Sequence, residues 1–218
     1  VERYLPASEA SGNRQGITYS KLSIEATPSS IVQLQGLLTL PILLKDVPTW
    51  HQTGVLILAQ SDEQSNRQKK LIAANDWPAT FMKQVTNSEA SDLAGIALNH
   101  GGIWLPTGGW LDLKKTTETL LNDERITVQK YSNLQAVKTE NSTHQLMIER
   151  SNGIDTIEAD TVIFTNALES ARFAPMDLPL IPLLGQVTEL SCDIGLKVPI
   201  CGETYLAVSY THLTLPTI

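Results

Sequence analysis

Cysteine is scarce in this sequence, and so are closely spaced histidines and long apolar runs. The two cysteines, Cys192 and Cys201, have neither the spacing of a zinc knuckle nor that of a disulfide framework, so they predict reduced thiols in a cytosolic protein. The four histidines are scattered, which argues against a zinc site. The longest apolar run, Leu37–Leu44, is far shorter than about 20 residues and contains Pro41, so no membrane span is expected. A secretory signal pattern is also missing from the first residues.

The sequence also contains fewer basic residues than acidic ones. The chain has 16 Lys and Arg residues against 23 Asp and Glu residues, which gives a formal net charge of -7. Clamping nucleic acid by bulk electrostatics needs clustered Lys and Arg, so the chain as a whole is not built for it. An RNA substrate would need a local basic patch or another domain. The 42% hydrophobic and 18% charged content is ordinary for a globular protein and argues against disorder.

The sequence also contains no G-x-G-x-x-G turn, the phosphate-binding element of a dinucleotide-binding unit. It opens instead with a possible strand over residues 1–5, followed by the polar loop "ASEASGNRQGITYSKLS" over residues 7–23. An acidic residue at the end of the second strand of such a unit accepts hydrogen bonds from the adenosine ribose, and Glu2 stands in that position. Taken alone, Glu2 fits a solvated surface residue at least as well.

Helix-like and strand-like segments alternate along the rest of the chain. We expect helices over residues 29–40, 62–76, 88–98 and 111–121, the first of them ended by Pro41. We expect strands over residues 54–60, 126–131, 134–140 and 144–150, and a strand-like segment over residues 155–167 that ends in a buried strand at 161–165. The Asn152-Gly153 pair predicts a tight hairpin turn. The mixture indicates α/β or α+β architecture with a small antiparallel meander and no internal repeat.

Five segments carry a family resemblance: "ASGNRQGITYSKLS", "GGIWLPTGGWL", "TVIFTNALESARFA", "PLLGQVTEL" and "CGETYLAV". In order and approximate spacing, from Glu2 to Val208, they resemble the FAD-dependent oxidoreductase domain of the bifunctional tRNA 5-methylaminomethyl-2-thiouridine biosynthesis proteins, within the D-amino-acid-oxidase-like flavoprotein family. The resemblance implies an incomplete Rossmann-like FAD/NAD(P)-binding domain joined to an antiparallel-sheet substrate domain. It also implies that the first strand, its glycine-rich turn and the following helix lie upstream, so that this chain is a fragment.

The same resemblance implies domain boundaries. A partial FAD-binding domain would comprise residues 1–45 and 108–172, and a substrate domain residues 46–107 and 173–208. The last ten residues, 209–218, do not follow the family pattern, and we expect them to be a non-native tail.

The cofactor-binding residues that the resemblance implies are scattered along the chain: Glu2, Ala10, Ser11, Gly12, Asn13, Gln15, Gly16, Gly108, Gly109, Leu134 and Ala167. Tyr205 matches an aromatic residue on the substrate side, and no other catalytic candidate is identified. Two positions depart from the family: Ala167 where many relatives have glycine, and Leu184 where arginine is usual. Plain structural roles stay open throughout, namely a polar surface turn, a glycine-rich turn beside a core tryptophan, a core leucine and a half-buried tyrosine.

The resemblance further implies an activity and partners. The cofactor would be FAD, and the substrate the carboxymethylaminomethyl group on the wobble uridine of tRNA, which is converted to the aminomethyl form with release of glyoxylate. In the intact family a methyltransferase domain then uses S-adenosylmethionine to methylate the amine, and no part of this sequence represents that domain. Two alternatives stay open. One is a small-molecule amine or amino-acid oxidase of the glycine-oxidase type, mildly favoured by the acidic charge, and the other is an inactive fragment without the phosphate-binding turn.

Overall fold

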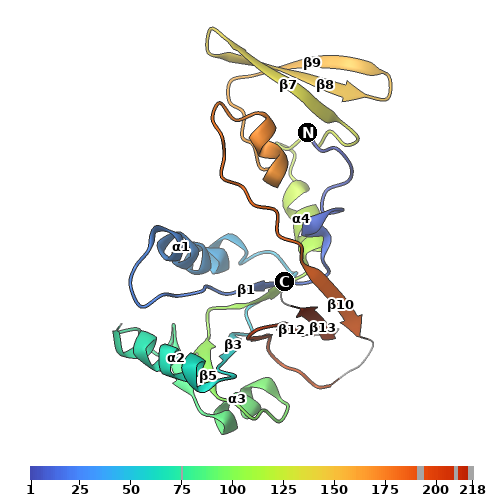
Figure 1. The fold of residues 1–218 in the computed structure, drawn as a ribbon. Helices are drawn as coiled ribbons and strands as arrows, with labels where there is room; N and C mark the ends of the chain where they lie inside the picture. Colours follow the sequence, from blue (N-terminus) through green and yellow to red (C-terminus); the bar gives the residue numbers. More distant parts are fainter. Residues whose placement is uncertain (75, 191–193, 209–210, 216–218) are drawn as a thin grey trace. The chain divides into compact units, whose positions relative to one another are not determined.

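The computed structural model describes residues 1–74, 76–190, 194–208 and 211–215 (Figure 1). The chain divides into two compact units. The first unit comprises Val1–Gly12 and Leu120–Leu184, and the second unit comprises Asn13–Thr119 and Gly185–Ile218. No helix in the described ranges is long and apolar enough to cross a membrane. The functional domain boundaries expected from the family resemblance stay predictions.

A seven-stranded sheet forms the centre of the second unit. Its strands lie in the order β10-β13-β12-β11-β3-β5-β4, and only β3 and β11 pair in parallel among them. The bounds are β3 (Val55–Leu58), β4 (Lys83–Val85), β5 (Gly102–Leu105), β10 (Gln186–Leu190), β11 (Ile200–Cys201), β12 (Tyr205–Ala207) and β13 (Thr211–Leu215). The strand expected over residues 54–60 is therefore confirmed. Residues 209, 210 and 216–218 of the expected non-native tail lie outside the described residues, and that expectation stays a prediction.

Strands β3 and β5 are apolar on both faces because helices cover both sides of them. Successive side chains of a strand point to opposite faces. Leu56 and Trp104 accordingly pack into one cluster with Ala90 of helix α3, while Ile103 and Leu105 pack into another with Leu71 of helix α2. Leu37 of helix α1 belongs to this second cluster. Trp104 is thus a core residue.

Within the described ranges, four α-helices match the expected segments apart from their ends. They are α1 (Pro28–Leu43), α2 (Asp62–Ala74), α3 (Asn87–Ala94) and α4 (Leu113–Leu121). The expectation that Pro41 ends the first helix is wrong, because Pro41 lies in the last turn, where its missing N–H removes only one hydrogen bond. Helix α3 starts with a capping box of Thr86 and Glu89 and stops at Gly95, whose φ of 77° is left-handed.

A second, three-stranded sheet in the same unit has the order β1-β6-β2, with β1 (Gly16–Thr18), β2 (Trp50–His51) and β6 (Gly109–Leu111). Its strands approach one another closely at the glycine pair. A Cβ on Gly108 would lie 2.8 Å from the Thr18 carbonyl oxygen, and one on Gly109 would lie 2.1 Å from that of His51. Only glycine fits these two positions, because the protein's own backbone already occupies the space.

The first unit is built on the expected antiparallel meander of β7 (Asn133–Glu140), β8 (Thr143–Arg150) and β9 (Gly153–Ala159). The hairpin predicted at Asn152-Gly153 is confirmed. The register between β7 and β8 shifts between Leu134 and Ala136, which places a bulge at Gln135. A 3-10 helix, η2 (Ala167–Arg172), completes the unit together with the N-terminal segment.

Three expected strands do not form, and all of them belong to the first unit. Residues 1–5 and 126–131 are joined by isolated main-chain hydrogen bonds, such as the one from Glu2 N–H to the Gln129 oxygen at 2.8 Å. Residues 161–165 are neither strand nor buried, and Ile163 is 80% exposed. A strand needs a partner for its backbone groups, and none of the described residues pairs with 161–165.

Truncating Leu105 to alanine should lower the free energy of unfolding of the second unit by about 2–5 kcal/mol, because it opens a cavity at a fully buried position. All four tryptophans lie in this unit, so a urea titration followed by tryptophan fluorescence reports on it. Leu38→Ala is the control, since Leu38 is 48% exposed and its truncation should change stability by less than about 1 kcal/mol. Equal losses in the two variants would contradict the core described above.

The glycine pair gives a second test. Gly109→Ala should destabilise the unit by about 1–3 kcal/mol, because the new methyl group must push β2 away from β6. Gly36→Ala is the matched control: nothing lies within 4 Å of a Cβ there, and alanine in a helix interior should stabilise by about 0.5–1 kcal/mol. Thermal unfolding followed by circular dichroism separates the two. A Gly109→Ala variant as stable as the wild type would show that β2 and β6 are further apart.

Candidate functional site

The residues expected to bind the cofactor fall on both units. Glu2, Ala10, Ser11, Gly12, Leu134 and Ala167 belong to the first unit, and Asn13, Gln15, Gly16, Gly108, Gly109 and the substrate-side candidate Tyr205 belong to the second. The chain crosses from one unit to the other between Gly12 and Asn13, inside the loop expected to face the cofactor. The binding role of these residues stays a prediction.

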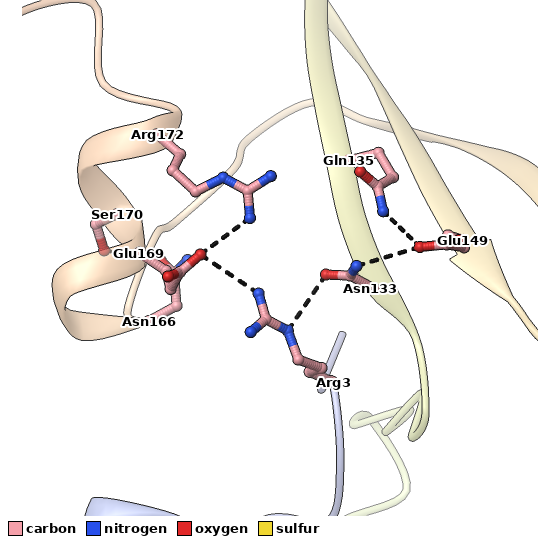
Figure 2. A network of polar contacts seen from close by, with 8 residues as sticks. All are labelled: Arg3, Asn133, Gln135, Glu149, Asn166, Glu169, Ser170 and Arg172. Carbon is pink, nitrogen blue, oxygen red and sulfur yellow. Dashed lines mark hydrogen bonds and ion pairs between the residues drawn. The ribbon is translucent and has the colours of Figure 1, made fainter.

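In the first unit, a network of polar side chains ties three separate segments together (Figure 2). The Arg3 guanidinium donates to Asn133 Oδ1 at 3.3 Å and to the Glu169 carboxylate at 3.4 Å. Arg172 donates to the same carboxylate at 2.9 Å. The hydrogen bonds from Arg172 and Arg3 hold the pKa of the Glu169 carboxyl below its usual value. The network therefore joins the N-terminal segment to β7 and to η2.

The network continues to strand β8 (Figure 2). Asn133 Nδ2 and Gln135 Nε2 both donate to the Glu149 carboxylate, at 3.2 and 2.5 Å. The side chains of Arg3 and Glu169 are 42% and 47% exposed, so solvent screens their ion pair and it contributes little to stability. Its effect is positional: it holds separate segments in one arrangement.

This arrangement brings the expected nucleotide-side residues of the first unit into one neighbourhood. Glu2 precedes Arg3, and Leu134 lies between Asn133 and Gln135 at the bulge. Ala167 starts the 3-10 helix that carries Glu169. Positions that are distant in the sequence are thus neighbours in the fold, as a shared ligand requires. Leu134 is half-buried, which leaves its alternative role as a packing residue open.

Backbone geometry explains two of the small residues in the first unit. Ala167 has a φ of 49°, in the left-handed region that glycine adopts most easily, which is a physical reason for glycine at this position in relatives. Ala10–Gly12 forms the short 3-10 turn η1, and a Cβ on Gly12 would lie 2.5 Å from the Ala7 carbonyl oxygen. Gly12 is therefore required by the turn itself. Leu184, the other departure from the family pattern, is 86% exposed.

In the second unit, unpartnered polar atoms gather around the glycine pair. Thr18 Oγ1, Thr107 Oγ1 and Trp110 Nε1 are buried and have no hydrogen-bond partner within the described part of the chain. Thr18 pairs with Gly109 across the sheet, and Thr107 and Trp110 flank the glycine pair in the sequence. Buried polar groups normally have partners, so these three atoms suit a polar ligand that supplies them. The residues present therefore fit a cofactor with many hydrogen-bonding groups.

The glycine pair itself carries less information about a ligand than the sequence predicted. The space beside Gly109 is filled by the protein's own backbone and that beside Gly108 by backbone and the Val55 side chain, so packing within the protein alone explains both residues. Trp110 stacks on His51 with ring centroids 4.0 Å apart. In the predicted loop, Asn13 is exposed and Gln15 is half-buried. Gly16 begins β1, where a Cβ would lie 2.9 Å from the Leu113 side chain.

Tyr205 lies on β12, where its hydroxyl shares a hydrogen bond of 2.5 Å with the hydroxyl of Tyr19. Burial raises the pKa of Tyr19 far above its usual value, and the bond to Tyr205 raises it further. Tyr19 is therefore a neutral phenol at physiological pH. The pair can orient a polar group by hydrogen bonding, although the substrate-side role of Tyr205 stays a prediction beside its structural alternative.

Tyr19 also lines a pocket of about 280 Å³ that includes Ser20, Lys21, Arg67 and Cys201. Cys201 is a free thiol, 1% exposed, and burial raises its pKa to about 12, so it is not a nucleophile at neutral pH. Cys192, the other expected thiol, lies outside the described residues. Sequence reasoning missed this pocket because Arg67 reaches it from a distant helix.

Thr18 and Thr107 were also missed as candidates, although both stand inside the two quoted glycine-containing segments. Their place in the same segments as the predicted cofactor-binding glycines could have identified them as candidates. Only the structure shows that their hydroxyls are buried without partners.

Comparison with known proteins places the chain among flavoproteins. Residues 1–211 match the family model DAO, described as FAD dependent oxidoreductase. The tRNA 5-methylaminomethyl-2-thiouridine biosynthesis bifunctional protein MnmC of Chromohalobacter salexigens is 34% identical over 215 residues, 95% of this chain and 30% of the relative. The protein of the same name from Marinobacter nauticus is 29% identical over 214 residues, 94% of this chain and 33% of the relative. The chain thus spans about a third of the length of these curated relatives.

Solved structures show the fold. Glycine oxidase from Bacillus cereus superimposes with a TM-score of 0.78 at 15% identity, covering 100% of this chain and 63% of that protein. Glycine oxidase from Geobacillus kaustophilus gives a TM-score of 0.74 at 16% identity with the same coverage. The expected fold class, mixed α/β with part of an FAD-binding domain, is confirmed. Since the family model matches nearly the whole chain, the chain belongs to the DAO family of FAD dependent oxidoreductases, whose cofactor is FAD.

Proposed function

We propose that a protein containing this chain oxidises the carboxymethylaminomethyl group on the wobble uridine of tRNA and releases the aminomethyl form. The observation that carries this proposal is the similarity of 29–34% identity to MnmC proteins over 94–95% of the chain. These relatives are named as bifunctional tRNA biosynthesis proteins. Because they are about three times as long, a methyltransferase domain that uses S-adenosylmethionine belongs to the proposal as a further part of the longer protein.

The chain would hold FAD along two groups of residues. Glu2 would accept hydrogen bonds from the adenosine ribose, with Leu134 and Ala167 nearby and the small residues Ala10, Ser11 and Gly12 allowing close backbone approach. Asn13 and Gln15 would follow along the loop. The buried atoms of Thr18, Thr107 and Trp110 would gain their missing hydrogen-bond partners there, beside Gly16, Gly108 and Gly109. The amides for the pyrophosphate would come from a glycine-rich turn elsewhere in the longer protein.

FAD, when bound, supplies the two-electron acceptor for the carbon between amine and carboxylate. The residues of this chain contribute orientation and a site with little water. Tyr205, paired with the neutral phenol of Tyr19, would position the substrate by hydrogen bonding. The oxidised substrate is an imine, and its hydrolysis leaves the primary amine on the uridine and releases glyoxylate. No acid–base pair of the protein is required if the amine binds in its neutral form.

A small-molecule amine oxidase of the glycine-oxidase type is the second candidate. Two observations favour it. The net charge of -7 disfavours the binding of tRNA, and the fold is similar to that of two glycine oxidases. The similarity in fold at 15–16% identity does not extend to the substrate. The inactive fragment is the third reading, and FAD binding by the 218-residue chain at micromolar concentration would contradict it.

Turnover by the protein encoded by the complete gene tests the proposal directly. Purified with FAD, it should convert tRNA that carries carboxymethylaminomethyluridine to the aminomethyl form, measured by mass spectrometry of the digested nucleosides. Free glycine, followed by release of hydrogen peroxide, should react at background rate. Turnover of glycine with unchanged tRNA would reverse the order of the two candidates.

The hydroxyl of Tyr205 gives a narrower test in the same protein. Tyr205→Phe should lower kcat/KM on tRNA by about tenfold, the equivalent of one lost hydrogen bond of roughly 1.4 kcal/mol, with the affinity for FAD unchanged. Tyr19→Phe is the matched control, because it breaks the same tyrosine pair from the other side. If both variants lose the same activity, Tyr205 acts only through the pair and the substrate-side role is refuted.

A further inference from the structure

We propose that the pocket beside Tyr19 binds an organic oxyanion, a carboxylate or a phosphate, through Lys21, Arg67 and the Ser20 hydroxyl. The pocket, of about 280 Å³, lies between the segment 19–24 and helix α2, with Ile57 of β3 and Ile103 of β5 among its lining residues. None of the residues proposed to hold FAD lines it. The pocket shares Tyr19 with the tyrosine pair proposed to position the substrate, but anion binding in it requires neither FAD nor turnover.

The charge of the lining points to an anion. Lys21 and Arg67 are the charged residues among the lining side chains, which include no aspartate or glutamate. Both are exposed, and neither forms an ion pair with a described acidic residue. Cys201 and Tyr19 also line the pocket, and burial raises the pKa of each, so both stay neutral at physiological pH. The pocket is thus locally positive on a chain whose net charge is -7.

The hydrogen-bonding groups are consistent with that charge. Ser20 is 1% exposed and its Oγ has no hydrogen-bond partner among the described residues. An unpaired buried hydroxyl is unfavourable, and a ligand oxygen that accepts its hydrogen bond would relieve that cost. One atom of each neighbouring side-chain amide has a partner within the protein: Gln68 Nε2 donates to the Ile57 oxygen at 3.0 Å, and Gln64 Oε1 accepts from Gln60 N–H at 2.7 Å.

The remaining wall is apolar. It is formed by side chains from the sheet, helix α2 and the loop before β4, namely Ile57, Leu71, Met82, Ile103 and Leu105. With the Tyr19 ring, this wall suits a planar or apolar body attached to the anion. A volume of about 280 Å³ is at the lower end of the range for ligand pockets, so the site takes a small molecule or one end of a larger one. A phosphate of RNA and the carboxylate of a small substrate share this chemistry.

Binding of three uracil compounds to the 218-residue chain at low ionic strength, measured by calorimetry, tests the proposal and separates the two sources. Uridine 5′-monophosphate carries a phosphate, orotate carries a carboxylate, and uridine carries neither. We expect at least one of the two anions to bind about tenfold or more tighter than uridine, as expected for charge-assisted hydrogen bonds. Tighter binding of the monophosphate identifies a phosphate site, and tighter binding of orotate a carboxylate site. Equal affinity for all three, or no binding of either anion, would overturn the proposal.

Variants locate the site. Arg67→Gln and Lys21→Gln should each weaken the better anion about tenfold, while Lys69→Gln, on the same helix but outside the pocket, should leave its affinity unchanged. Both lining cations are exposed, so at least one variant is expected to keep the wild-type thermal midpoint. Wild-type affinity in both variants, or an equal loss in Lys69→Gln, would refute the assignment. Because no flavin or turnover is involved, this outcome is distinguishable from a failure of the proposed function.

Discussion

The antiparallel pairing of β3 with β5 is the contact on which the second unit depends. Each residue from Val55 to Leu58 pairs with one from Leu105 to Gly102, and the backbones are so close that a Cβ on Gly102 would lie 2.1 Å from the Ile57 oxygen. The alternating side chains of this pair feed both hydrophobic clusters, one covered by α3 and the other by α1 and α2. The same two strands provide part of the apolar wall of the proposed anion pocket. Core packing and the proposed anion pocket therefore both depend on the pairing of β3 with β5.

The first unit is organised differently. It has a hydrogen-bonded meander and the polar network around Arg3, with Ile148 as its fully buried apolar residue, while Ile163 and Leu184 are strongly exposed. Residues 161–165 have the composition of a buried strand but pair with no described residue. The two glycine oxidases of similar fold are longer than this chain, because this chain covers 63% of each.

The proposed anion pocket and the proposed cofactor site differ in charge. A net charge of -7 opposes nucleic-acid binding by the chain as a whole. Lys21 and Arg67 place positive charge at the proposed anion pocket, whose lining residues include no aspartate or glutamate. The buried unpartnered atoms of Thr18, Thr107 and Trp110 instead suit a polar cofactor with its own donors and acceptors. The two sites therefore differ in the chemistry they can bind.

The sequence alone determined the family, the mixed fold class and most of the helices and hairpins. The helices and hairpins depend on contacts within a few residues, such as the capping box of Thr86 and Glu89 or the turn at Asn152-Gly153. Only the tertiary structure decided that 161–165 pairs with no described residue, that Gly109 packs on the protein's own backbone, and that Arg67 joins Ser20 in one pocket. The reason is physical: strand pairing and pocket formation depend on which distant segments meet, and no local pattern of residues encodes that meeting.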